Sequence, residues 1–299
     1  MAILPPYLKA GDSIALIATA RKISHLELLP SIELIESWGL NVITAPNLYK
    51  EENQFAGSDE ERAADLQWAL DNETIKAVLC VRGGYGTVRI INQIDFSKFA
   101  KQPKWIIGYS DVTVLHQHIQ TNINVATLHA TMPINFFKNE EATESLRKTL
   151  FGGNLHYEVN PYYLNREGEV EGELIGGNLS LIYALCGSNS DIDTDGKILF
   201  IEDLDEYLYH VDRMMMNLKR SGKLANLKGL VVGGMSDMKD NTIPFGKTAE
   251  EIIFDAVKEY HYPVCFNFPA GHIDRNFALL LGKTYSLSVT KNHIHLKFT

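Results

Sequence analysis

Short apolar segments alternate with segments of helical spacing over residues 13–120 of this chain. Apolar residues dominate 13–18, 76–81 and 105–109, whereas 26–37 and 111–120 repeat apolar residues at helical intervals. This alternation is typical of a parallel, doubly wound sheet with helices on its faces. Because sites in such sheets form at the carboxyl ends of the strands, the segments that follow the strands are where chemistry is expected.

The second half of the chain has a different pattern. A stretch rich in Gly, Asn, Tyr and Pro predicts a linker over 156–170. Residues 1–155 would then form the doubly wound N-terminal domain. We expect 171–299 to form a smaller, mixed α/β domain that closes with strands at 286–289 and 293–298.

Composition excludes several classes of partner. The chain has 299 residues and a formal net charge of −9, which argues against nucleic acid as a partner. It starts without the basic flank and apolar core of a signal peptide, and no apolar run approaches the roughly 20 residues that span a bilayer. Cys80, Cys186 and Cys265 have the apolar neighbours of core residues. We therefore expect a cytoplasmic protein that does not associate with membranes.

One serine stands where a strand is expected to give way to a helix. The apolar run that starts at 105 ends in Gly108 and Tyr109, and Ser110 follows at once. A serine at such a turn can expose its hydroxyl, and the backbone N–H groups after it can hold an oxyanion at the positive end of the helix. The same position also suits a serine that only caps the helix.

A glycine-rich loop, Arg-Gly-Gly-Tyr-Gly at 82–86, follows another predicted strand. Glycines let backbone N–H groups approach a ligand closely, so the loop could donate to an oxyanion beside Ser110. It matches neither the dinucleotide nor the Walker pattern. Taken alone, it could equally be a tight turn between a strand and a helix.

Two later segments contain a carboxylate cluster and a histidine. Four acidic residues fall within 202–206, directly after an apolar strand, and His272 lies in a loop flanked by Gly and Pro. Each feature alone fits a solvated loop. With Ser110 available, a carboxylate could orient His272, which would act as a general base.

The other histidines do not predict a metal site. His116 and His118 are two residues apart on a predicted helix, so they face different ways. His293 and His295 share one face of a predicted strand, but no further ligands accompany them. No cofactor is expected.

Together these segments resemble the LD-carboxypeptidase family of serine peptidases, which also contains the microcin C self-immunity peptidases. The similarity covers nearly the whole chain. Its motifs are Arg-Gly-Gly-Tyr-Gly at 82–86, Gly-Tyr-Ser-Asp-x-Thr at 108–113, Ile-Gly-Gly-Asn-Leu at 175–179, the strand end at 199–203, Asp212-Arg213, Gly271-His272 and Leu281-Gly282.

The resemblance implies a catalytic triad of Ser110, Glu202 and His272, with the serine in the N-terminal domain and the other two residues in the C-terminal domain. Glu202 is preferred to Glu206 because the family's carboxylate directly follows the apolar strand. The implied substrate is a murein tetrapeptide, from which the enzyme removes the terminal D-alanine during cell-wall recycling. The resemblance also suggests a homodimer.

Further roles follow from the same resemblance. The backbone N–H groups of Asp111 and Gly84 would form the oxyanion hole. Arg82 and Arg275 are candidates to bind the free carboxylate of the substrate, on sequence proximity alone. Relatives often have His-Gly-Pro-Met where this chain has His-Ala-Thr-Met at 129–132, and this departure concerns the substrate rather than the triad.

Three alternatives are distinguishable. An immunity-type peptidase would use the same triad on aminoacyl or peptidyl nucleotides and needs an aromatic surface for the base, for which Tyr162 and Tyr163 are candidates. A non-catalytic binding protein would hold its ligand between the domains. An ordinary α/β-hydrolase is disfavoured because Gly-Tyr-Ser-Asp-Val at 108–112 is not G-x-S-x-G.

Overall fold

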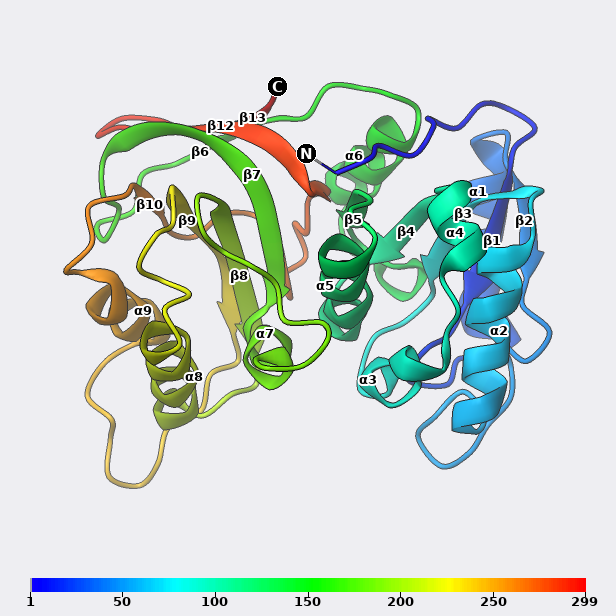
Figure 1. Ribbon diagram of the computed structural model, residues 1–299, viewed down its shortest axis with the longest axis horizontal. Helices are drawn as coiled ribbons and strands as arrows, with labels where there is room; N and C mark the ends of the chain where they lie inside the picture. Colours follow the sequence, from blue (N-terminus) through cyan, green and yellow to red (C-terminus); the bar gives the residue numbers. More distant parts are fainter. Residues whose placement is uncertain (1) are drawn as a thin grey trace.

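The computed structural model describes residues 2–299, and their strands form two sheets, one of six and one of seven strands (Figure 1). The strand order of the first sheet is β11-β5-β4-β3-β1-β2. All neighbours in it are parallel except β11 and β5. Its strands are β1 (Ser13–Ile17), β2 (Asn41–Thr44), β3 (Ile75–Cys80), β4 (Trp105–Gly108), β5 (Thr127–His129) and β11 (Leu279–Leu281).

The helices of the first half connect these parallel strands. They are α1 (His25–Ser37), α2 (Asp59–Asp71), α3 (Thr87–Ile90), α4 (Ser97–Lys101), α5 (Thr113–Asn122) and α6 (Glu140–Leu150). Helix α2 begins with a capping box, because the Ser58 side chain accepts from the Glu61 N–H and the Glu61 carboxylate accepts from the Ser58 N–H. The predicted helix over 111–120 is α5, preceded by a short 3₁₀ turn over Ser110–Val112.

The second sheet has the strand order β10-β9-β8-β7-β12-β13-β6. Its first four strands are parallel, and β12, β13 and β6 continue the sheet in antiparallel fashion. The strands are β6 (His156–Val159), β7 (Gly168–Asn178), β8 (Ile198–Leu204), β9 (Gly229–Ser236), β10 (Val264–Cys265), β12 (Lys283–Val289) and β13 (Ile294–Phe298), with helices α7 (Leu179–Leu185), α8 (Leu208–Arg220) and α9 (Ala249–Val257). The predicted α/β class, with a mostly parallel sheet followed by a mixed one, is confirmed.

Two strands depart from the expected division of the chain. The segment expected as a linker, 156–170, begins with β6, which pairs with β13 at the edge of the second sheet. Tyr157 and Val159 of β6 are buried and alternate with exposed residues, a strand pattern hidden among Gly, Asn and Pro. In turn, β11 comes from the C-terminal half but completes the first sheet beside β5.

One continuous apolar core joins the two halves. It contains the buried strands of the first sheet together with Leu174, Tyr285 and Leu287 of the second sheet. Helix α5 lies between the two sheets (Figure 1) and contacts both β5 and β7. Loops at the ends of strands from both halves are therefore held at one interface, where the predicted site residues lie. Within residues 2–299, no helix is long and apolar enough to cross a membrane.

Candidate active site

Ser110 occupies a sharp turn directly after β4. Its φ of +64° lies in the left-handed region that side chains rarely adopt, a conformation typical of an exposed nucleophile at a strand-to-helix turn. Gly108 makes the turn possible, because a Cβ there would lie 2.8 Å from the Val112 side chain. Ser110 does not cap the helix, since no side-chain cap hydrogen bond is present at either the 3₁₀ turn or α5.

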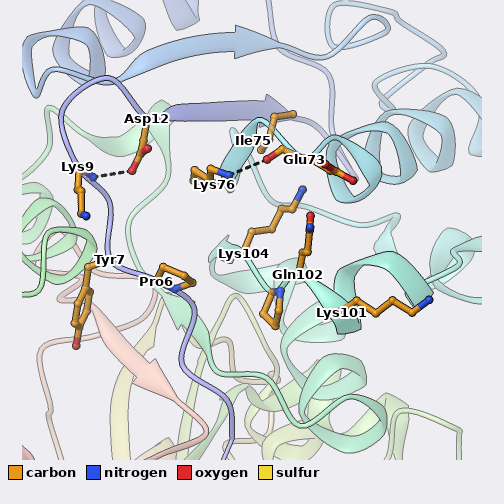
Figure 2. A pocket seen from close by; sticks show the side chains of 11 residues that line it. Pro6, Tyr7, Lys9, Asp12, Glu73, Ile75, Lys76, Lys101, Gln102 and Lys104 are labelled. Atoms are coloured by element: carbon orange, nitrogen blue, oxygen red, sulfur yellow. Dashed lines mark hydrogen bonds between the residues drawn. The ribbon is translucent and has the colours of Figure 1, made fainter.

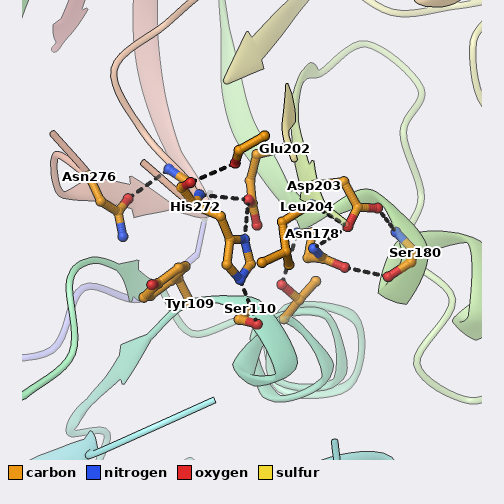
Figure 3. A network of polar contacts seen from close by, with 12 residues as sticks. Tyr109, Ser110, Asn178, Ser180, Glu202, Asp203, Leu204, His272 and Asn276 are labelled. Atoms are coloured by element: carbon orange, nitrogen blue, oxygen red, sulfur yellow. Dashed lines mark hydrogen bonds and ion pairs between the residues drawn. The ribbon is translucent and has the colours of Figure 1, made fainter. Parts of the chain in front are cut away.

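The predicted serine, histidine and glutamate form one hydrogen-bonded chain (Figure 3). His272 lies in the loop after β10, and its Nε2 is 3.0 Å from Ser110 Oγ. Its Nδ1 lies 2.7 Å from Oε2 of Glu202, which sits near the end of β8. In the neutral imidazole, Nδ1–H therefore donates to Glu202, and Nε2 is free to accept the Ser110 proton.

Glu202 and His272 shift each other's pKa in opposite directions. Burial alone would raise the pKa of Glu202, but the charge and hydrogen bonds of His272 outweigh it and hold that pKa below its usual value. Burial alone would lower the pKa of His272, but the Glu202 carboxylate raises it above the usual value. The pair thus favours a glutamate that stays ionised and an imidazole that readily takes up a proton.

The backbone around His272 is built closely onto Glu202. The His272 N–H donates to Glu202 Oε2 at 3.0 Å, and Ser236 Oγ donates to the His272 carbonyl at 2.6 Å. Gly271 has a φ of +103°, and a Cβ there would lie 2.6 Å from the Glu202 side chain. Only glycine lets the loop approach this closely, which explains the Gly-His pair of the sequence.

The sequence has counterparts among known proteins. Residues 14–130 match the LD-carboxypeptidase N-terminal domain, and residues 171–287 match the LD-carboxypeptidase C-terminal domain. A probable murein peptide carboxypeptidase of Bacillus subtilis is 35% identical over 297 residues, which cover 96% of this chain and 92% of that protein. The chain belongs to the LD-carboxypeptidase family.

Solved structures extend the likeness to the fold. The muramoyltetrapeptide carboxypeptidase from Oxalobacter formigenes is 28% identical, with a TM-score of 0.88 over 96% of this chain and 98% of that one. MccF in complex with glutamyl sulfamoyl guanosine is 20% identical, with a TM-score of 0.86 over 100% of this chain and 98% of that one. The second likeness concerns the fold alone.

The glycine-rich LD-carboxypeptidase motif at 82–86 lies beside the serine. A Cβ at Gly83 would lie 3.0 Å from Ser110 Cβ and 3.1 Å from its Oγ, so the glycine keeps the space next to the hydroxyl open. Gly84, the residue expected to donate to the oxyanion, has a φ of +127° and packs on the Arg21 side chain. Asp111 is buried, and its Oδ2 accepts from the Thr87 N–H at 2.8 Å, which ties the serine turn to the end of the loop. Gly83 was missed in the sequence, although it belongs to the same motif.

The Ile-Gly-Gly-Asn-Leu motif of the family joins the two halves. Asn178 donates its backbone N–H to Thr113 Oγ1 at 3.0 Å, and its side-chain amide donates to Asp203 Oδ1 at 2.9 Å. A Cβ at Gly177 would lie 2.5 Å from Thr113 Oγ1, so glycine allows this approach. Burial raises the pKa of Asp203 to about 7.

The two predicted substrate-binding arginines have other partners. Arg82 donates to the Lys22 carbonyl at 3.2 Å, and the exposed Arg275 pairs with Glu141 of α6 at 3.2 Å. Glu206, the carboxylate not chosen for the triad, pairs with His210 at 2.5 Å rather than with His272.

Cavities lie at both ends of the parallel strands of the first sheet. A cavity of about 160 Å³ borders His272, and its lining includes Tyr109, Lys138 and Asn276 but neither arginine. A larger one, of about 590 Å³, lies near the amino ends of β3 and β4 (Figure 2) and is lined in part by Lys104. Because Ser110 follows the carboxyl end of β4, the larger cavity lies at the opposite end of the strands from Ser110. Among residues 2–299 no group of His, Cys, Asp or Glu is arranged to hold a metal ion.

Proposed function

We propose that this protein is a serine carboxypeptidase that cleaves the peptide bond between an L-centre and the terminal D-alanine of murein tetrapeptides. The observation that carries the proposal is the hydrogen-bonded chain from Ser110 Oγ through His272 to Glu202. The names of its relatives, a probable murein peptide carboxypeptidase and a muramoyltetrapeptide carboxypeptidase, supply the substrate class.

The reaction starts with acylation of the serine. His272 Nε2 takes the hydroxyl proton as Ser110 Oγ bonds to the carbonyl carbon before D-alanine, and the carbonyl π electrons move onto its oxygen. The backbone N–H groups of Asp111 and Gly84 would stabilise this oxyanion. Glu202 stabilises the imidazolium, a role supported by the 2.7 Å contact and by the raised pKa of His272.

Breakdown and deacylation complete the cycle. The C–N bond breaks, His272 returns the proton to the leaving nitrogen, and D-alanine departs with a free amine. Water then attacks the acyl-serine ester and gives its proton to His272, and the ester C–O bond breaks with return of that proton to Ser110. The products are a tripeptide and D-alanine, and the enzyme is restored without any cofactor.

The proposal places the protein in the cytoplasm as a homodimer that recycles cell-wall peptides. The three unpaired cysteines fit a reducing compartment. The dimer rests on the family alone.

The decisive experiment uses L-Ala-γ-D-Glu-meso-diaminopimelate-D-Ala as substrate and follows free D-alanine by mass spectrometry. Wild-type protein should release D-alanine, and Ser110→Ala should not. If the folded wild-type protein releases none, the murein proposal fails. Cleavage of an aminoacyl-nucleotide analogue instead would favour the immunity-type activity. Tyr162, one candidate to stack the base in that reaction, packs against the buried Phe266 in the C-terminal half.

A further inference from the structure

The small cavity is lined in part by His272, and its size limits the ligand that it can hold. Its volume of about 160 Å³ is below the roughly 300 Å³ at which sites for larger ligands begin, so it holds one small residue rather than a peptide. His272 and Tyr109 both line it, with their ring centroids 4.9 Å apart.

The chemistry of the proposed reaction assigns a direction to the substrate. A general acid must reach the leaving nitrogen within hydrogen-bond distance, so the residue after the scissile bond extends toward His272. The residues proposed to hold the oxyanion, Asp111 and Gly84, do not line this cavity. The leaving residue therefore points into the cavity that His272 lines.

A buried amide whose nitrogen has no hydrogen-bond partner belongs to Asn276, which lines this cavity. Asn276 is 2% exposed, and its Oδ1 accepts from the Gly271 N–H at 2.7 Å. A backbone N–H can only donate, so the amide oxygen must face Gly271. Burial lowers the pKa of His129 to about 4, so this residue is neutral and donates Nε2–H to the same oxygen at 3.0 Å.

These two contacts fix the orientation of the Asn276 amide. Its nitrogen points away from Gly271 (Figure 3) and, within residues 2–299, has no hydrogen-bond partner although it is buried. Buried donors are normally paired, so the unpaired N–H groups of Asn276, a residue that lines the cavity, are available to an acceptor placed there.

The same cavity contains one lysine. Lys138 lines it together with His272, and the positive charge of Lys138 opposes the rise in the His272 pKa that Glu202 causes. Among residues 2–299, Lys138 pairs with no carboxylate in the resting structure. Asp237 and Asp274 also line the cavity, which therefore presents both signs of charge.

We infer that this cavity receives the leaving D-amino acid and that Lys138 and the Asn276 amide bind its carboxylate. The inference deepens the proposed function and rests on it. The aspartates suit the product, because D-alanine leaves with a new ammonium group as well as its carboxylate. A binding site for a terminal carboxylate next to the general acid also explains why such an enzyme removes the last residue of a peptide.

The kinetic test compares two substrates, the tetrapeptide with its free terminal carboxylate and the same peptide ending in a carboxamide. Wild-type protein should prefer the acid, and Lys138→Gln should reduce that preference about tenfold, through KM rather than kcat. Lys148→Gln is the matched control, because Lys148 is exposed on α6 and lines a different cavity. Asn276→Asp, which keeps the acceptor oxygen but adds negative charge, should impair cleavage of the acid more than of the amide.

A binding test separates this inference from the proposed function. Free D-alanine and D-alaninamide are titrated into Ser110→Ala protein, with and without Lys138→Gln, by isothermal calorimetry. Cleavage of the tetrapeptide with an unchanged acid-to-amide preference in Lys138→Gln overturns the cavity assignment and leaves the peptidase. Binding of D-alanine that needs Lys138, in a protein that cleaves no tetrapeptide, supports the cavity assignment while the peptidase proposal fails. If the protein neither cleaves the tetrapeptide nor binds D-alanine, both the peptidase proposal and the cavity assignment are overturned.

Discussion

Thr113 Oγ1 accepts a hydrogen bond from the Asn178 backbone N–H at 3.0 Å, across the interface between the two halves of the chain. Thr113 begins the helix that follows Ser110, and Asn178 ends the strand next to the one that carries Glu202. The contact therefore fixes the serine turn relative to the strand that positions its partners. The hydrogen-bonded chain of Ser110, His272 and Glu202 is therefore assembled by the docking of two sheets rather than within either one.

Loss of any triad side chain should remove most of the activity without unfolding the protein. Ser110→Ala and His272→Ala should each lower kcat by roughly four to six orders of magnitude, and Glu202→Gln by about 10⁴. Because the three act as a unit, the double variant Ser110→Ala/His272→Ala should fall no further than the single variants. D-Alanine release measures the effect, and circular dichroism checks the fold. Full activity in Ser110→Ala would contradict the serine mechanism.

The pH dependence should report the raised pKa of His272. The general base must be neutral, so kcat/KM should rise with pH through a midpoint above the ordinary value of 6.5. In Glu202→Gln the carboxylate that raises this pKa is gone and burial remains, so the midpoint should move down. Titration of the His272 ring protons by NMR gives both midpoints. An unchanged midpoint in Glu202→Gln would contradict the assigned coupling.

Gly176 should tolerate alanine less well than Gly187. Both have positive φ, +126° and +77°, but a Cβ at Gly176 would overlap the Phe200 carbonyl, whereas nothing lies within 4 Å at Gly187. Gly187→Ala should lose about 1–2 kcal/mol of unfolding free energy from backbone strain alone. Gly176→Ala should lose more, because β7 and β8 must also separate. Urea unfolding compares the two variants, and equal losses would mean that the close strand approach carries no energetic weight.

Asp203 should make the stability depend on pH with a specific sign. Its folded-state pKa of about 7 lies above the ordinary value of 3.8 for an aspartate, so the folded state binds the proton more tightly than the unfolded state. Its contribution to stability is therefore largest at low pH and declines as pH rises from about 4 to 7. Asp203→Asn should lack this slope. The measurement is the difference in unfolding free energy between wild type and variant across that range; a constant difference would contradict the shifted pKa.

The sequence predicted the fold where local patterns decide it. Strands β1, β3 and β4 and helices α1 and α5 follow from apolar spacing, whereas α4, β5 and α6 were not predicted. The strands β6 and β11 were missed because they have only four and three residues and pair with strands far away in the chain. Each of them forms only because the folded sheet has an unpaired edge strand, β13 for β6 and β5 for β11, to which it can add.

The sequence predicted those site residues that can be recognised from their residue type and from their position after a strand. Ser110, Glu202 and His272 are brought together as expected, whereas their catalytic roles and those of Asp111 and Gly84 stay predictions. Asn276 and Lys138 were missed because nothing in their local sequence marks them. Their relevance arises from the orphaned amide and the shared cavity, which only the packed structure reveals.

The pairing of β11 with β5 has a consequence for how the protein is made. Leu279 lies opposite His129, so the first sheet acquires its last strand only after residue 279 has been synthesised, about 150 residues after its partner. The nucleophile-bearing half then leaves the ribosome with an open edge at β5, and its sheet closes in a late step that also brings the His272 loop into position. Contacts so distant in sequence slow folding. The proposed activity should thus appear only once residues 279–281 have been synthesised, and a chain truncated before residue 279 should lack it.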